Sequence, residues 1–293
     1  MKSRALVIVN PIAGSYTKEK YNSLCTALTN GGMEFDVFFT DKKGDAEAQT
    51  HTAIKEQTHS LILVCGGDGT ANEVVNAAAF SDIPVGFLPF GLTNVICREI
   101  GTQKPIPEAA KIILNGTVKS AALGKVTSIE TEKHRYFISM AGFGFDGKAV
   151  FGLNRRLKKR FGIWAYIFSG LQSFLNYVPV DIGLTVEDFV YEATSVIVSN
   201  GSRYGGDFKI APNADITNDT LYASIFNERT RMEIIRDVIS IIRGQSCRCR
   251  HIKHIQCQHV TIDNGVHAQI DGDYLGKGSW TVETVGNALQ VIY

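Results

Sequence analysis

The sequence lacks an excess of charge of either sign, a long apolar run and a signal peptide. Thirty Lys and Arg residues nearly balance 29 Asp and Glu residues, so the formal net charge of +1 does not favour a nucleic-acid partner. No apolar run reaches the roughly 20 residues that a membrane-spanning helix needs. The first ten residues run directly into a strand-like stretch rather than an apolar signal sequence. We therefore expect a cytoplasmic protein that is soluble or sits on a membrane surface.

The sequence also has few cysteines, and their number does not suggest a disulfide framework. Six cysteines in 293 residues without a signal sequence are expected to be reduced thiols. Six candidate zinc ligands do fall within thirteen residues: Cys247, Cys249, His251, His254, Cys257 and His259. Their spacing is irregular and lacks the two-residue gaps of a zinc knuckle. The pattern favours a strand over a metal site, although it leaves zinc binding open.

The length exceeds the usual size of one hydrophobic core, which predicts two domains, at 1–122 and 123–293. The first contains four apolar runs separated by helix-compatible segments: Ala5–Val9, Phe35–Phe39, Leu61–Cys65 and Val85–Leu88. This alternation predicts an α/β domain with a doubly wound, mainly parallel sheet. A polar, turn-rich segment follows each run, so all four segments should meet at the carboxyl edge of the sheet, where such folds bind ligands.

The second region has short strand-like pieces, the first of them Tyr136–Met140, and predicts a mainly β domain. Asn-Gly or Asp-Gly turn signals stand at 200–201, 264–265 and 271–272. Two helical stretches, Arg156–Tyr177 and Arg229–Arg243, interrupt the strands. The last strand, Leu289–Tyr293, is compatible with a return to the first domain.

A glycine-rich loop, Gly66-Gly67-Asp68-Gly69-Thr70, follows the apolar run at 61–65 and precedes a helix-like segment. Glycines in such a turn let backbone N–H groups approach phosphate oxygens, and the helix N-terminus adds partial positive charge. The charge of Asp68 opposes phosphate, a conflict that a bound Mg²⁺ would resolve. The chain has neither the Walker lysine motif nor the Gly-x-Gly-x-x-Gly fingerprint after a strand, which argues against ordinary P-loop enzymes and dinucleotide dehydrogenases.

Taken together, seven motifs resemble the catalytic family of diacylglycerol kinases, which includes bacterial lipid kinases and the sphingosine and ceramide kinases. They follow the family order over nearly the whole chain: Asn10-Pro-x-x-Gly14, Gly66–Thr70 with Asn72-Glu73, Pro89-x-Gly91 with Asn94, Gly142–Gly147, Asn200-Gly201 with Gly205-Gly206, Ala211-Pro212 and Asp271-Gly272-Asp273. The resemblance implies an N-terminal nucleotide domain like that of NAD kinases and diacylglycerol kinases, a C-terminal β-sandwich domain, and a cleft where ATP·Mg²⁺ meets a lipid hydroxyl.

The resemblance also implies roles for individual residues. Those expected to contact the nucleotide are Asn10, Thr40, Gly66, Gly67, Asp68, Gly69, Thr70, Asn72, Gly91, Thr93 and Asn94. Asp273 stands where the family usually has a glutamate that acts as general base, and Asp271 is expected to assist its geometry. Asp68 is expected to organise Mg²⁺. Asp219 is a second candidate magnesium ligand.

Several departures from the family pattern keep other functions open. The acid expected at Val95 is missing, and Ala122 replaces an aspartate. Diacylglycerol is the first choice of acceptor, and a sphingosine or ceramide type of kinase is the next. An NAD kinase-like enzyme is a further alternative, because that superfamily shares the Gly-Gly-Asp-Gly sequence of the glycine-rich loop. The missing acids also keep open a catalytically impaired lipid- or nucleotide-binding regulator.

A basic segment followed by aromatic residues predicts peripheral association with an anionic membrane. The cations are Arg155, Arg156, Lys158, Lys159 and Arg160, and aromatic residues follow from Phe161 to Tyr177. Cations next to an apolar, aromatic helix suit an anionic bilayer surface. The alternative is an amphipathic core helix whose charges face solvent. A homodimer is compatible with the sequence.

Overall fold

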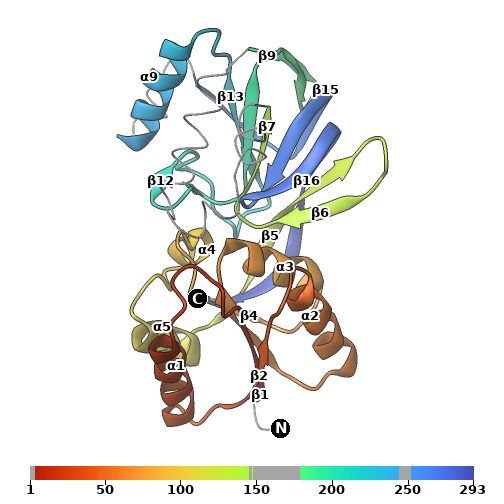
Figure 1. The fold of residues 1–293 in the computed structure, drawn as a ribbon. Helices are drawn as coiled ribbons and strands as arrows, with labels where there is room; N and C mark the ends of the chain where they lie inside the picture. Colours follow the sequence, from red (N-terminus) through yellow and green to blue (C-terminus); the bar gives the residue numbers. More distant parts are fainter. Residues whose placement is uncertain (1–3, 145–146, 148–178, 244–251) are drawn as a thin grey trace. The chain divides into compact units, whose positions relative to one another are not determined.

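The computed structural model describes residues 4–144, 147, 179–243 and 252–293 (Figure 1). It divides into two compact units. The first unit combines Met1–Ala121 with Asn287–Tyr293, and the second comprises Ala122–Gly286.

The sheet of the first unit has the order β2-β1-β3-β4, and the final residues of the chain extend it beside β4. Every neighbouring pair is parallel, including Val85 of β4 with Val291 of the last strand. The strands and helices of this unit are β1 (Arg4–Val9), α1 (Lys18–Asn30), β2 (Glu34–Phe39), α2 (Asp45–Glu56), β3 (Leu61–Gly66), α3 (Asp68–Ala78), β4 (Val85–Pro89), α4 (Val95–Glu99) and α5 (Ile106–Asn115).

Helices cover both faces of this sheet, in two pairs. Helix α1 packs against α5, and α2 packs against α3 (Figure 1). Every residue of β3 is buried, as expected for a central strand with helices on both sides. Helix α1 begins after Thr17, whose hydroxyl accepts a hydrogen bond from the Lys20 amide. The doubly wound architecture predicted from the alternating runs is confirmed.

Strand register places the four polar segments at one edge. Val9 pairs with both Phe39 and Cys65, and Gly66 pairs with Pro89. Because the strands are parallel, the residues that follow them leave the sheet on the same side. The carboxyl edge expected from the sequence is therefore present.

The second unit is mainly antiparallel β structure. Its strands are β5 (Val118–Ser128, which begins in the first unit), β6 (His134–Phe137), β7 (Met140–Gly144), β8 (Ile182–Val186), β9 (Phe189–Ala193), β10 (Ser195–Ser199), β11 (Arg203–Tyr204), β12 (Phe208–Lys209), β13 (Leu221–Phe226), β14 (Lys253–Cys257), β15 (His259–Ile270) and β16 (Asp273–Ile292). The path β14-β13-β10-β7-β15-β16 is antiparallel throughout. Strands β8 and β9 extend from β15, and their inward residues join a core around Phe143 and Trp280.

Two local expectations for this unit were wrong. The run expected as one strand, Tyr136–Met140, is interrupted between β6 and β7 because backbone amides there donate to Asp271. The Asn264-Gly265 pair, expected as a chain-reversing turn, is an irregularity inside β15 where the pairing with β16 shifts register. Both residues adopt positive φ, as a β-bulge allows.

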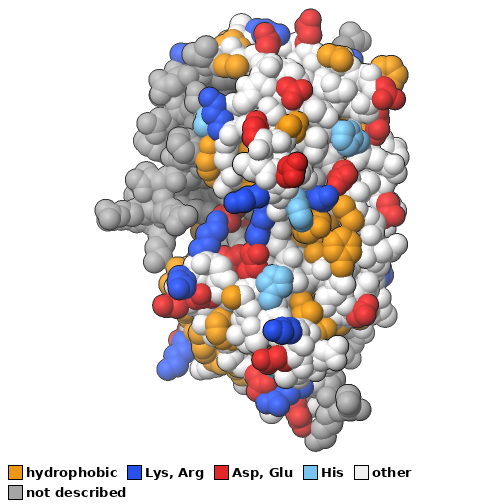
Figure 2. Space-filling view, turned by 90° about the vertical axis from the view of Figure 1, so that its right-hand side faces the viewer, with side chains coloured by type: hydrophobic (Ala, Val, Ile, Leu, Met, Phe, Trp, Pro, Cys, Tyr) orange, Lys and Arg blue, Asp and Glu red, His pale blue; other side chains and the backbone are white. Residues whose placement is uncertain are grey.

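The second unit also contains helix α9 (Arg231–Ile242), which lies within the predicted stretch 229–243. It begins with a capping box, in which Thr230 and Glu233 bond each other's backbone amides. In the part of the chain that the structure describes, no helix is long and apolar enough to cross a bilayer. Figure 2 shows acidic and basic side chains interspersed over one face, in keeping with the small net charge.

Candidate functional site: the glycine loop and the edge around it

The glycine loop forms the transition from β3 to α3. Gly67 is the N-cap of α3, and the cap has no side-chain hydrogen bond. The first amides of a helix have no acceptor within the helix itself. Together with the helix dipole, they favour an anion at this end of α3. The loop can therefore present backbone donors to a phosphate group.

Asp68 connects this loop to the loop after β4. One carboxylate oxygen accepts a hydrogen bond from the Thr93 hydroxyl at 2.6 Å, and the other accepts from the Val95 amide at 2.7 Å. Val95 is the first residue of α4, whose own N-cap residue, Asn94, makes no side-chain cap. Asp68 therefore caps α4 from a distance of 27 residues in sequence, a role that the sequence did not suggest.

The 91–94 loop is closed by a buried asparagine. The Asn94 side chain accepts from the Gly91 amide at 2.7 Å and donates to the Gly91 carbonyl at 3.0 Å. Asn94 has φ of 48°, in the left-handed region that asparagine tolerates. A Cβ added to Gly91 would lie 2.6 Å from the Cα of Gly67. The two loops thus approach each other backbone to backbone, and Gly91 cannot carry a side chain there.

The loop after β1 also contacts the glycine loop. Asn10 donates through its side chain to the Thr70 hydroxyl at 2.9 Å and accepts from the Ile12 amide at 3.0 Å. Thr40 joins the same edge through its backbone, since its amide donates to the Val9 carbonyl at 2.9 Å. The structure therefore brings residues from three of the predicted segments into one hydrogen-bonded arrangement and places Thr40 at the same edge.

The remaining predicted nucleotide contacts lie in β3 and α3. Gly66 has no room for a side chain, since an added Cβ would be 2.5 Å from the Cβ of Thr70. Gly69 lies in the first turn of α3. Asn72 is buried, and its side chain accepts from Asn76 at 3.1 Å. These positions shape the turn, and Gly69 is the partly exposed member of this group.

Asp271, in the second unit, is also held by backbone groups. Its carboxylate accepts hydrogen bonds at 3.0 Å from the amides of Ile138, Ser139 and Met140. It occupies the two-residue turn between β15 and β16, with φ of 45°. Asp271 therefore fixes the segment between β6 and β7, and the predicted turn at 271–272 is confirmed.

Asp273 begins β16 and is half-buried. The next residue, Tyr274, shares a 2.8 Å hydrogen bond with the His267 ring, and burial raises the pKa of the Tyr274 hydroxyl. Asp273 thus stands at the start of β16, two residues from the anchored Asp271.

The described residues contain no group of three or more His, Cys, Asp or Glu side chains that could hold a metal ion by themselves. Mg²⁺ usually takes one or two carboxylates together with substrate phosphates, and each Asp68 oxygen keeps a further lone pair. Asp68 therefore fits such an ion. Asp219 is exposed, and its carboxylate lies so close to Gly286 that an added Cβ there would overlap it.

Two predictions concern residues outside the described part. The basic positions 155–160 and the aromatic stretch after them are not described, nor are Cys247, Cys249 and His251. Of the other candidate zinc ligands, His254 shares a 3.0 Å hydrogen bond with Ser224, and Cys257 is buried, which raises its thiol pKa to about 12. A protonated thiol is a poor metal ligand.

Comparison with known proteins covers both units. Residues 4–126 match the model of the diacylglycerol kinase catalytic domain, and residues 139–293 match that of the YegS C-terminal NAD kinase beta sandwich-like domain. A diacylglycerol kinase of Staphylococcus saprophyticus is 26% identical, covering 94% of this chain and 91% of the relative. A diacylglycerol kinase of Bacillus subtilis is 27% identical, covering 93% and 90%.

A crystal structure of a diacylglycerol kinase from Bacillus anthracis has the same fold. It superposes with a TM-score of 0.79 at 24% identity, over 99% of this chain and 97% of that one. That structure therefore matches both the α/β unit with its parallel sheet and the β-sandwich unit that follows. The chain therefore belongs to the diacylglycerol kinase family and is a lipid kinase.

Proposed function

We propose that this lipid kinase transfers the γ-phosphate of ATP to the hydroxyl group of diacylglycerol. The observation that carries the proposal is the linked pair of loops around Asp68, because it supports a phosphate-binding helix N-terminus at the edge where parallel sheets bind ligands. The Staphylococcus saprophyticus and Bacillus subtilis relatives, which match over 94% and 93% of this chain, are named diacylglycerol kinases, and this favours diacylglycerol as the acceptor.

In the first unit, the proposal assigns phosphate binding to backbone amides from Gly67 to Thr70. Asn10 and Thr93 position this loop through their bonds to Thr70 and Asp68. Thr40, Asn72, Gly91 and Asn94 complete the predicted nucleotide contacts. Mg²⁺, when bound, neutralises charge that develops on the transferred phosphoryl group, and Asp68 would hold it directly or through water.

In the second unit, the proposal assigns the general base to Asp273. A carboxylate can accept the proton of the attacking hydroxyl as the bond to phosphorus forms. Asp271 acts as a positioning residue, because its three backbone bonds fix the turn that carries Asp273. Asp219 stays a predicted magnesium ligand.

Access to the lipid is proposed to occur at a membrane surface. The basic residues Arg155, Arg156, Lys158, Lys159 and Arg160 would attract anionic headgroups, at about 1 kcal/mol for each cation. Neutralising Lys158, Lys159 and Arg160 should reduce sedimentation with anionic liposomes. Unchanged sedimentation would contradict this role.

Transfer of label from γ-³²P-ATP tests the chemistry. Vesicles with diacylglycerol, sphingosine or ceramide, and free NAD, should be assayed side by side with Mg²⁺. We expect label in phosphatidic acid. Labelled NADP would indicate an NAD kinase. A labelled sphingolipid would identify sphingosine or ceramide, rather than diacylglycerol, as the acceptor. ATP binding without transfer to any acceptor would favour a regulator without catalysis.

Variants separate the roles of the two aspartates in the turn. Asp273→Asn should lower kcat by at least about 100-fold, since general base catalysis typically contributes 10²–10⁴-fold. Asp271→Asn is the matched control, because asparagine keeps an acceptor and tolerates positive φ. At temperatures where this variant is folded, it should lower kcat far less than Asp273→Asn does. Equal activities of Asp273→Asn and the wild type would exclude Asp273 as the base.

A further inference from the structure

Helix α9 of the second unit presents an apolar stripe to solvent. Met232, Ile235 and Ile239 are 71%, 39% and 41% exposed. Because successive residues of a helix are rotated by about 100°, these three positions fall within an arc of about 60°. Exposed apolar side chains that gather on one face, rather than being scattered singly, mark a surface that contacts another molecule.

The other face of α9 packs on its own unit. Ile234 and Asp237 are buried, and Ile241 packs against a core cluster that contains Met140 and Ile210. These three helix positions also share one arc, which lies roughly opposite the exposed stripe. Figure 1 shows α9 at the margin of this unit. The fold of the described residues therefore uses one side of the helix and leaves the apolar stripe to solvent.

The exposed charges beside the stripe are positive. Arg231 and Arg243 are exposed at the two ends of the helix, and the side chain of Arg236 is 41% exposed between them. The two acidic side chains of α9 are held elsewhere. Glu233 closes the capping box, and Asp237 is buried and accepts a hydrogen bond from Arg236 at 3.0 Å. The outward face thus combines apolar groups with cations, a pattern that complements an anionic lipid surface.

The size of this face also favours a bilayer over a protein partner. The helix has 12 residues. Such a helix is about 18 Å long and about 10 Å wide, so its outward face offers about 200 Å². A stable protein interface buries about 800 Å² on each partner. Lipid headgroups can receive a few apolar side chains flanked by cations without so large a contact.

We propose that the outward face of α9 docks on an anionic lipid bilayer. This face, the α9 surface, consists of Met232, Ile235 and Ile239 with the flanking Arg231 and Arg243. The three apolar side chains enter the headgroup region, and the guanidinium groups bind lipid phosphates. The inference rests on the proposed action at a membrane surface and adds a second contact to that of the basic positions 155–160.

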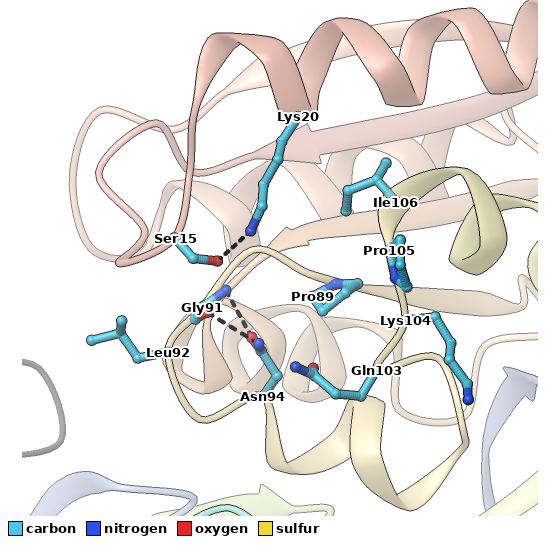
Figure 3. Close-up of a pocket in the computed structure, with 10 residues that line it drawn as sticks. All are labelled: Ser15, Lys20, Pro89, Gly91, Leu92, Asn94, Gln103, Lys104, Pro105 and Ile106. Carbon is cyan, nitrogen blue, oxygen red and sulfur yellow. Dashed lines mark hydrogen bonds between the residues drawn. The ribbon is translucent and has the colours of Figure 1, made fainter.

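The residues of the α9 surface differ from those of the proposed nucleotide site. A cavity of about 280 Å³ in the first unit belongs to that site, because Gly91 and Asn94 line it and are hydrogen-bonded to each other (Figure 3). Asp68 and Asp273 likewise lie on other elements. Substitutions on the α9 surface should therefore leave phosphoryl transfer to a soluble acceptor unchanged, so that docking can be measured by itself.

Sedimentation of the full chain with vesicles of phosphatidylcholine and phosphatidylglycerol tests the apolar stripe. Ile235→Gln combined with Ile239→Gln should weaken binding at least about tenfold, because glutamine forms helix well but loses the apolar contact. Val118→Thr combined with Val190→Thr is the matched control, since it alters two exposed valines on β5 and β9. Wild-type affinity in the α9 variant, or an equal loss in the control, would overturn the proposal.

The same assay tests the flanking cations. Arg231→Gln combined with Arg243→Gln should weaken binding to these anionic vesicles roughly 30-fold and leave binding to pure phosphatidylcholine vesicles unchanged. Lys55→Gln combined with Lys111→Gln is the matched control, because it removes the same charge from exposed positions on α2 and α5. Equal losses in the two variants would mean that net charge acts without a docking surface, which would overturn the proposal.

Activity and oligomeric state separate this proposal from its alternatives. Each α9 variant should keep the wild-type kcat on a soluble short-chain diacylglycerol, which also excludes a folding defect. If the wild type transfers phosphate to no lipid while vesicle binding still depends on α9, the proposed function fails and the α9 surface is supported. If light scattering shows that Ile235→Gln with Ile239→Gln changes the oligomeric state without changing vesicle binding, the face joins two copies of the chain, and the proposal is overturned.

Discussion

An aspartate carboxylate is anchored both at the carboxyl edge of the first unit and in the β15–β16 turn of the second unit, but the partners differ. Asp68 accepts from one backbone amide and one hydroxyl, whereas Asp271 accepts from three backbone amides. Asp68 reaches a loop 27 residues away because parallel strands return their ends to one edge. Asp271 reaches amides 131 to 133 residues away because antiparallel β7 and β15 lie side by side. In both regions the anchored carboxylate stands near a residue assigned to chemistry. A charged residue in a predicted site can therefore have a structural role, in which its carboxylate holds the local backbone in place.

The largest expected effect comes from Asp271. Asp271→Ala removes three hydrogen bonds to a carboxylate and puts a residue with a Cβ but no polar group at positive φ, so it should cost about 3–5 kcal/mol in unfolding free energy. Asp271→Asn keeps one acceptor oxygen and should cost about 1–2 kcal/mol. Urea unfolding of both variants measures the difference. A loss below about 1 kcal/mol for Asp271→Ala would mean that the turn does not depend on this anchor.

A smaller effect is expected from the glycines that meet between the loops of the first unit. Gly91→Ala places a Cβ 2.6 Å from the Cα of Gly67 and should cost about 1–3 kcal/mol through overpacking. Gly67→Ala is the control, because its Cβ would lie at an ordinary 3.5 Å from Gly91 and its φ of −94° suits any residue. Thermal melting should separate the two variants.

The effect of Gly67→Ala on nucleotide binding tests the role of the glycine loop. If backbone amides of the glycine loop receive phosphate, Gly67→Ala should weaken ADP binding while its melting temperature stays near that of the wild type. Isothermal titration with ADP measures this. If Gly67→Ala bound ADP with the affinity of the wild type, the phosphate groups would not bind to the backbone amides of this loop.

The smallest effect concerns two glutamates near α9 whose pKa values shift in opposite directions. Burial raises the pKa of Glu228, whereas the backbone amide of Arg229, followed by that of Thr230, lowers the pKa of Glu233. A raised carboxyl pKa means that stability falls as pH rises from the unfolded pKa through the folded one. A lowered pKa contributes stability at higher pH that is lost as pH falls through the folded pKa.

Removing each charge should therefore have opposite results. At pH 7.5, Glu228→Gln should raise the melting temperature and Glu233→Gln should lower it. Both differences should shrink at pH 4, below the usual glutamate pKa of 4.5. Melting curves at the two pH values provide the measurement, and the same sign for both variants would contradict the assigned causes.

Patterns within short segments were sufficient to predict the architecture. The uninterrupted apolar runs predicted the parallel strands. The polar residues after them predicted the edge of the sheet at which ligands bind, because the connection rules for parallel strands allow few other topologies. The break between β6 and β7 and the bulge at 264–265 could not be predicted in this way. Both depend on hydrogen bonds with residues that are distant in sequence or on another strand.

The sequence by itself determined which residues meet at the carboxyl edge of the first unit, because strand order and direction follow from local periodicity. Only the tertiary structure decided what those residues do to one another. Asp68 looked like a metal ligand in an anion cradle, but it also caps α4, and Gly91 owes its lack of a side chain to Gly67. Such contacts depend on side-chain packing across the fold, which no local pattern encodes.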